Sequence, residues 1–113
     1  REEIVRQFEK DMWDAYLKPF HSPHRYNATG YRQMLDDFGP EGTAIILIDG
    51  EETNSGFIKL GDIHMLEWSV EAIILKLKYR IPDFAPTTPE RRAKARQRLR
   101  NYFTYKAPWD DGK

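Results

Sequence analysis

Apolar side chains recur at three- and four-residue steps along the first part of the chain. They are Ile4, Val5, Phe8, Met12, Ala15 and Tyr16. Because this spacing puts them on one helical face, it predicts an amphipathic helix from about Glu2 to Leu17. Proline lacks the amide hydrogen that a helix needs, so Pro19 is expected to end this helix. The residues from 20 to 25 then form a polar loop.

A second helix is expected to start at Asn27. The short amide side chain of Asn27 can accept a hydrogen bond from the free amides of a first turn. Tyr26 and Tyr31 have the spacing of a hydrophobic staple around such a start. Gly39 and Pro40 are expected to stop the helix.

The apolar run within residues 41–48 suits a buried strand as well as a buried helical turn. A short helix is favoured, because no second strand-like run exists to pair with it and an isolated strand cannot satisfy its own backbone. Residues 49–54 are expected to form an exposed acidic loop, and residues 55–60 a short helical turn closed by Gly61.

Residues 65–78 are the most apolar segment and are predicted to form one central helix. Leu66, Val70, Ile73, Ile74 and Leu77 would share one face, with Trp68, Ala72 and Leu75 on the other side. A helix that is apolar on two sides is normally buried among its neighbours.

Three prolines, Pro82, Pro86 and Pro89, bracket an extended connection from which Phe84 can reach the core. The last helix, over residues 88–103, is expected to have Thr87 or Thr88 as its cap and Pro89 in its first turn, where a missing amide is harmless. From about residue 104 the chain has no periodicity and is predicted to be a loosely packed tail. The pattern therefore predicts an all-α fold, a compact bundle of about five helices in one domain over residues 1–113.

Size and composition agree with this expectation. A chain of 113 residues is long enough for a single core. It contains no cysteine, which excludes disulfides and thiolate metal sites and fits a reducing compartment, so a cytoplasmic location is predicted. The longest apolar run, residues 44–48, is too short to span a bilayer, so no membrane association is expected.

Charge is unevenly distributed although the formal net charge is zero. Residues 36–71 carry nine acids and one lysine, whereas residues 88–103 carry six cations and one acid. The six cations are Arg91, Arg92, Lys94, Arg96, Arg98 and Arg100. They predict either a basic surface that grips a nucleic-acid backbone or ion pairs with the acidic middle of the same chain. The second interpretation is favoured, because nucleic-acid-binding modules are usually clearly basic overall.

Two carboxylates, Glu67 and Glu71, stand four residues apart on the predicted central helix. They could point at one metal ion or share a proton, but a metal pair normally recruits a histidine or further carboxylates at a defined spacing. A structural role is therefore favoured, and a buried Glu71 would need a partner such as an arginine of the last helix. No catalytic residue, metal or cofactor is predicted.

Several short motifs occur in a characteristic order along the chain. They are Tyr26-Asn27-Ala28-Thr29, Gly39 through Gly42-Thr43-Ala44, Ser55-Gly56-Phe57, Leu66 through Ser69-Val70-Glu71-Ala72, and Ala95-Arg96 through Arg98-Leu99 to Tyr102. With this ordered set the chain resembles a family of small bacterial helical proteins that have no known function. The resemblance implies a compact, mainly helical domain, and it implies no catalytic residue, ligand or partner.

The sequence thus favours a non-catalytic interaction or accessory domain of a bacterial protein, with another protein or another domain of a longer chain as its partner. Binding of DNA or RNA through the basic last helix is the alternative. An enzyme that uses Glu67 and Glu71 comes third.

Overall fold

The computed structural model describes residues 1–50 and 55–113, and in this part of the chain the fold is all-α, as predicted. The five α-helices found there are α1 (Glu2–His21), α2 (Thr29–Asp49), α3 (Ser55–Asp62), α4 (Val70–Ile73) and α5 (Pro89–Phe103). Three 3₁₀ turns accompany them: η1 (Leu66–Trp68), η2 (Leu77–Tyr79) and η3 (Ala85–Thr87).

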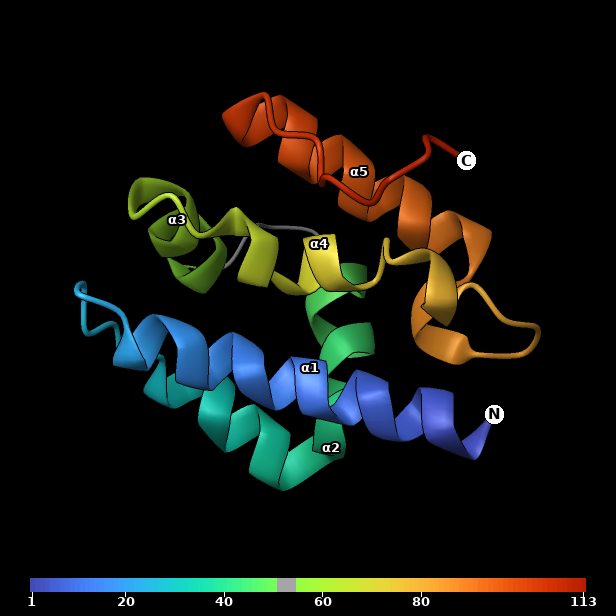
Figure 1. The fold of residues 1–113 in the computed structure, drawn as a ribbon, viewed down its shortest axis with the longest axis horizontal. Helices are drawn as coiled ribbons and strands as arrows, with labels where there is room; N and C mark the ends of the chain where they lie inside the picture. Colours follow the sequence, from blue (N-terminus) through green and yellow to red (C-terminus); the bar gives the residue numbers. More distant parts are fainter. Residues whose placement is uncertain (51–54) are drawn as a thin grey trace.

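The helices lie in three levels (Figure 1). Helix α1 and the first part of α2 pack together on one side, α5 lies on the opposite side, and α3, η1 and α4 run between them, with the second part of α2 rising behind α4. Side chains from each level meet in one core, including Phe8, Met12, Ile48, Ile73 and Leu99, all at most 1% exposed. The short middle level is thus enclosed between the two outer ones, and the end of α2 also contacts α5 directly.

Helix α1 passes Pro19 and ends at His21, so the predicted stop at Pro19 is wrong. The physical reason lies in the carbonyl of Pro19. It accepts from the amide of Ser22 at 3.3 Å, from the Ser22 hydroxyl at 2.7 Å and from the amide of Tyr26 at 3.1 Å. These donors close the helix after the proline rather than before it.

Asn27 does not cap α2. The helix begins at Thr29, and its N-cap, Ala28, has no side chain that could accept a hydrogen bond. The Asn27 side chain instead accepts from the hydroxyl of Tyr16 on α1, with an oxygen–oxygen distance of 2.7 Å. A tertiary partner has therefore displaced the local capping bond.

Helix α2 contains the interruption predicted at Gly39 and Pro40. Gly39 has φ 73° and ψ 169°, a conformation that glycine adopts easily and other residues rarely do. The helix resumes at once, so two helical segments form one kinked element rather than ending there. The helix favoured for residues 41–48 over a strand is confirmed.

The predicted central helix over residues 65–78 is wrong in its shape. The segment breaks into η1, α4 and η2, with extended backbone at Ser69 and Lys76. The Ser69 hydroxyl donates to the carbonyl of Leu66 at 2.7 Å and accepts from the amide of Ala72 at 3.1 Å, so it ends one turn and starts the next. The predicted burial of this segment agrees better with the structure, since residues 69–75 are all buried. Leu77 is an exception, because it is 51% exposed.

Helix α3 runs through Gly61 instead of being closed by it. Gly61 is buried because the ring of Phe103, the last residue of α5, lies against its Cα. The acidic loop expected over residues 49–54 begins in fact as helix, since Asp49 is the last residue of α2, and its residues 51–54 lie outside the described part of the chain.

Phe84 reaches the core as predicted, at 2% exposure, and α5 has the expected bounds. Thr88 is its cap and accepts from the amide of Arg91 at 3.3 Å. The segment after α5 docks more closely than the sequence predicts. The indole nitrogen of Trp109 donates to the carbonyl of Ala72 at 2.7 Å, and Ala107 is 1% exposed.

Candidate binding cavity

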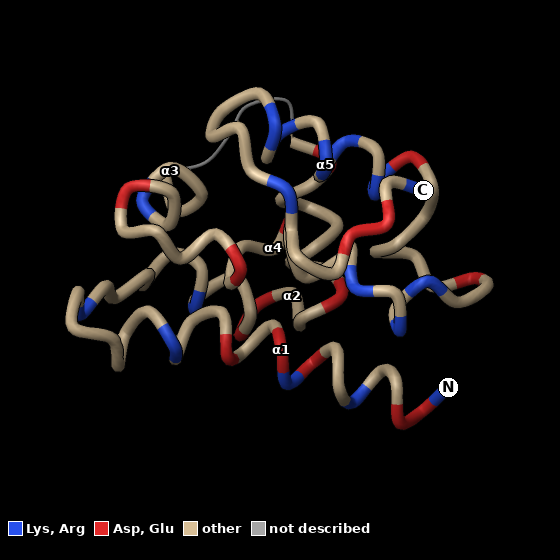
Figure 2. The backbone as a smooth tube through the Cα atoms, turned by 45° about the horizontal axis from the view of Figure 1, so that its top comes forward, with Lys and Arg blue, Asp and Glu red and all other residues tan. Residues whose placement is uncertain are grey.

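The basic face of α5 is largely engaged within the chain. Figure 2 shows lysine and arginine positions recurring along this helix. Arg91 makes a two-pronged ion pair with Asp49 at the end of α2, with nitrogen–oxygen distances of 2.8 and 2.9 Å. Lys94 donates to the main-chain carbonyl of Asp49 at 3.1 Å, and Arg92 to that of Thr87 at 2.7 Å. The pair with Arg91 lowers the pKa of the Asp49 carboxyl.

Two further aspartates, Asp110 and Asp111, anchor the segment after α5. Arg96 binds both oxygens of Asp110 at 2.8 and 2.9 Å, and Arg80 binds both oxygens of Asp111 at 2.7 and 3.0 Å. These bonds lower the pKa of both carboxyls. Among the described residues, Arg100 is the one of the six cations on α5 whose side chain has no hydrogen-bond or ion-pair partner, and it is exposed.

Arg98 is buried and joins three elements. Its guanidinium donates to the carbonyls of Leu47, at 2.9 Å, and of Gly50, two groups that the end of α2 leaves without helical partners. It also contacts the carboxylate of Glu71 on α4, with a nitrogen–oxygen distance of 3.4 Å. The sequence predicted that a buried Glu71 would take an arginine of the last helix as partner, and this is confirmed.

Glu71 is 2% exposed, and its carboxylate is sparsely bound. A carboxylate can accept about four hydrogen bonds, whereas Arg98, at a long distance, is the one side chain that donates to it within the described residues. Burial raises the pKa of Glu71, while a hydrogen bond from its own backbone and the charge and hydrogen bond of Arg98 oppose this shift. The chain therefore keeps a carboxylate in its interior with unused acceptor capacity.

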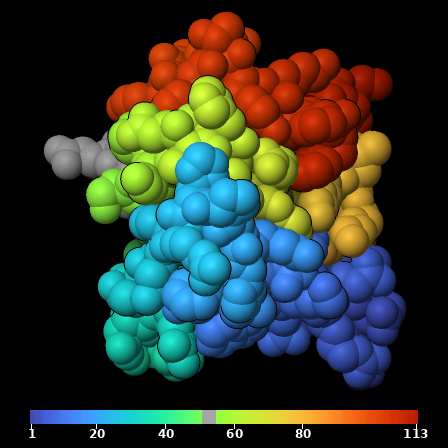
Figure 3. Space-filling view, turned by 60° about the vertical axis from the view of Figure 1, so that its left-hand side comes forward, coloured from blue at the N-terminus to red at the C-terminus, as the bar shows by residue number. Residues whose placement is uncertain are grey.

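A cavity of about 410 Å³ lies next to this carboxylate. It is bounded by the segment between α1 and α2, the starts of α2 and α3, and the turn from η1 into α4. Figure 3 shows the face on which the light-blue segment between α1 and α2 meets the yellow-green segment after α3. Of the lining residues, Asn27, Thr29, Gly30 and Ser55 are exposed and form the rim, while the buried Glu71 belongs to the floor.

Four aromatic rings line the cavity: Tyr26, Tyr31, Phe57 and Trp68. The hydroxyl of Tyr31 donates to the main-chain carbonyl of Met12 at 2.6 Å, which fixes the ring in the wall. Burial raises the pKa of Tyr31, and the negative charge of Glu71 raises it further. Among the described residues of this lining, Glu71 is the charged one.

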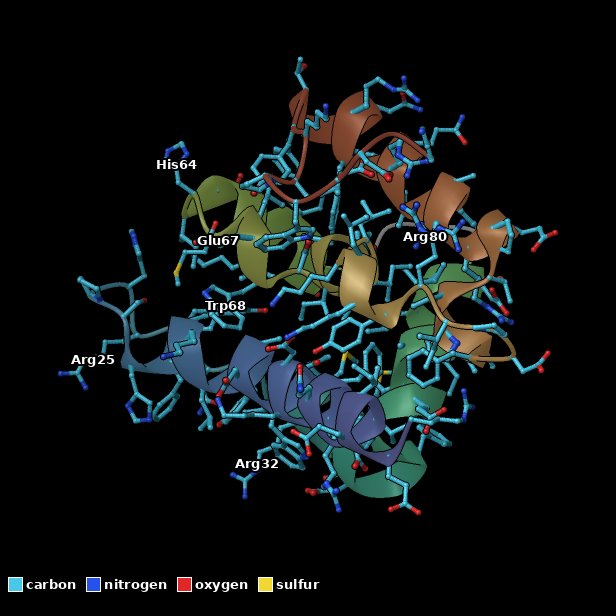
Figure 4. The ribbon with its side chains drawn as sticks, turned by 45° about the vertical axis from the view of Figure 1, so that its right-hand side comes forward. Arg25, Arg32, His64, Glu67, Trp68 and Arg80 are labelled. Atoms are coloured by element: carbon cyan, nitrogen blue, oxygen red, sulfur yellow. The ribbon has the colours of Figure 1, made fainter. Side chains whose placement is uncertain are left out.

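Glu67 and Glu71 do not share a face, because the chain turns at Ser69 between them. Glu71 points into the interior, whereas Glu67 is half-buried near Tyr105, whose pKa is raised by burial and by the charge of Glu67. In Figure 4 Trp68 points toward α1 and Glu67 away from it. Within the described ranges, no three His, Asp or Glu side chains gather in a way that could hold a metal ion.

The sequence did not reveal the cavity. It singled out Glu71, and Tyr26 and Tyr31 as helix-start residues, but it assigned Trp68 to the packing of a regular helix. Three of the motifs that carry the family resemblance meet here, namely those at residues 26–29, 55–57 and 69–71. Their order along the chain was the only signal available, and it says nothing of their convergence in space.

Comparison with models of protein families, with curated proteins and with solved structures finds no match to this chain. None of the helices in residues 1–50 and 55–113 combines the length and the apolar character that crossing a bilayer requires.

Proposed function

We propose that this chain is a non-catalytic interaction domain that binds a partner protein by taking one of its side chains into the cavity. The observation that carries the proposal is a cavity of about 410 Å³ with aromatic walls and an incompletely bound carboxylate, Glu71, in its floor. Cavities with mostly apolar walls and a few converging polar groups are the usual sites of ligands, and buried pockets receive the anchor side chains of interfaces.

The side chains around the cavity support binding rather than catalysis. The hydroxyl of Ser69 is used on both sides as a helix cap, and that of Tyr31 is held by a main-chain carbonyl. A nucleophile next to a general base, the arrangement that acyl or phosphoryl transfer would need, is not present in the lining given by the described residues.

The contacts of α5 make nucleic-acid binding the weaker proposal. Arg91, Arg96 and Arg98 already pair with carboxylates of the chain, and a phosphate backbone would have to displace these partners. The alternative stays a prediction, and its test is a mobility shift of labelled DNA and RNA at low and moderate salt.

The proposed function is tested by selecting peptides from a random library on the full chain. The test variant is Gly30→Leu, which adds a bulky side chain at the cavity rim, while Gly30→Ala is the matched control, because a Cβ at this exposed rim position meets no atom within 4 Å. Selected peptides should bind the wild type and G30A alike and lose at least tenfold in affinity for G30L. Failure to enrich any peptide, or equal binding to G30L, would contradict the proposal.

A further inference from the structure

We infer that the side chain received by this cavity is a lysine, whose alkyl stem packs against the aromatic walls and whose ammonium reaches Glu71. The inference rests on the proposed function and adds the chemistry of the partner. It follows from the charge, the free hydrogen-bonding capacity and the wall chemistry of the cavity.

The charge of the cavity lining sets the sign of the group that it can receive. Glu71 is the one ionic side chain among the described lining residues, so the cavity favours a positive group or a hydrogen-bond donor over an anion. Arg98 does not cancel this preference. Its guanidinium donates its shorter hydrogen bonds to the carbonyls of Leu47 and Gly50, and its contact with the carboxylate of Glu71 is longer, at 3.4 Å.

The contact between Arg98 and Glu71 limits the shape of the cation that can bind. Arg98 contacts Oε2 of Glu71, so a second guanidinium could not take both carboxylate oxygens in the two-pronged geometry that favours arginine. An ammonium is a compact charge that needs only one free oxygen. The geometry therefore favours lysine over arginine.

The walls of the cavity match the two parts of a lysine side chain. Lysine joins an apolar stem to a charged head, and the cavity joins aromatic and aliphatic walls to a carboxylate floor. Aromatic faces also attract ammonium groups. Two ammonium groups of the chain itself, those of Lys18 and Lys76, each lie 5.9 Å from the ring centroid of Trp68, although neither lysine lines the cavity. Because these charges oppose a third cation at Trp68, Glu71 is the group that must hold the incoming ammonium.

The test uses the full chain and small probes followed by NMR titration of backbone amides. The probe n-butylammonium has the stem and head of lysine, 1-butanol has the same shape without the charge, and butyrate has the opposite charge. We expect n-butylammonium to shift amides of cavity-lining residues and to bind about tenfold more tightly than 1-butanol, as a hydrogen bond to a charged group implies. Butyrate is expected not to bind. Equal affinity for the amine and the alcohol, or preference for butyrate, would overturn the inference.

Two variants test whether the charge of Glu71 causes the preference for the amine. Glu71→Gln should remove the preference for the amine, whereas Glu67→Gln, a matched change four residues earlier and outside the lining, should keep it. If E71Q does not fold, the selectivity among the three probes in the wild-type chain still decides the question. An amine preference that survives in folded E71Q would refute the role of Glu71.

The peptides selected above separate this inference from the function on which it rests. Replacing their lysines by norleucine, which keeps the stem and removes the ammonium, should weaken binding about tenfold. If these peptides bind in the cavity but tolerate norleucine, the interaction domain stands and the lysine inference falls. If no peptide binds at all, the proposed function itself fails.

Discussion

Gly61 offers the sharpest test of the packing that holds α3, a wall of the cavity, against α5. A Cβ added at Gly61 would lie within 2.5 Å of three ring carbons of Phe103, far inside the ordinary contact distance. The ring would have to move away, and its contact with Phe57, now at 5.4 Å between centroids, would open. Gly61→Ala should therefore destabilise the fold, although alanine is the better helix former.

The size of the effect follows from two opposing contributions. Overpacking in a well-filled interior typically destabilises by about 1–3 kcal/mol, while replacing glycine by alanine inside a helix stabilises by up to about 1 kcal/mol. Gly61 lies in the last turn of α3, where the gain is smaller. We expect a net loss of about 1–2 kcal/mol in the free energy of unfolding.

Urea denaturation followed by circular dichroism measures this loss. Gly30→Ala is the matched control, since its new methyl group meets nothing within 4 Å, and it should be neutral or stabilising. In a Phe103→Ala background the overlap disappears, so G61A should no longer destabilise, and the double-mutant cycle should show a coupling of similar size. The reasoning is refuted if G61A in the wild-type background is as stable as G30A.

Three further predictions concern the polar contacts. Arg98→Met should destabilise the fold by about 3–5 kcal/mol in urea titrations, because it leaves a buried carboxylate without its partner; a loss below 1 kcal/mol would contradict this. Thr88→Ala removes the cap of α5 and should lower the free energy of unfolding by about 1 kcal/mol, seen as a lower thermal midpoint, and an unchanged midpoint would argue against the cap. The pKa values of Asp110 and Asp111 are lowered in the folded state, so their stabilisation is present above the ordinary value of 3.8 and is lost as the pH falls below it. Acid titration of stability should therefore be flatter in the double asparagine variant between about pH 4 and 2, and identical curves would show that these ion pairs do not stabilise the fold.

Strong periodic patterns were reliable guides to the outer helices. The three- and four-residue spacing located α1, and the threonines before Pro89, of which Thr88 proves to be the cap, located the start of α5. Each of these signals is local, since an amphipathic face or a cap is complete within a few turns of chain. The fold class could accordingly be predicted from the sequence.

The errors occurred where a distant partner outweighed a local preference. Asn27 gave up its capping bond for the hydroxyl of Tyr16 on α1. Ser69 is the exception, because its bonds to Leu66 and Ala72 are local and break the apolar segment from within. The sequence predicts a helix end at Gly61, because nothing in it shows that the Phe103 ring lies against this glycine. A propensity of a few tenths of a kcal/mol cannot compete with a buried hydrogen bond or a packed ring.

The candidate site shows the same division. The residue types of the site are evident in the sequence: an acidic middle, a basic last helix, a carboxylate at Glu71 within an apolar segment, and aromatic residues before and after Asn27. Helix packing then brings Arg98 to the end of α2 and to Glu71, and it makes motifs from three parts of the chain enclose one cavity. The physical reason is that composition and periodicity fix what each segment can bury, whereas the packing of helices against one another decides which buried groups meet and which acceptor is left open.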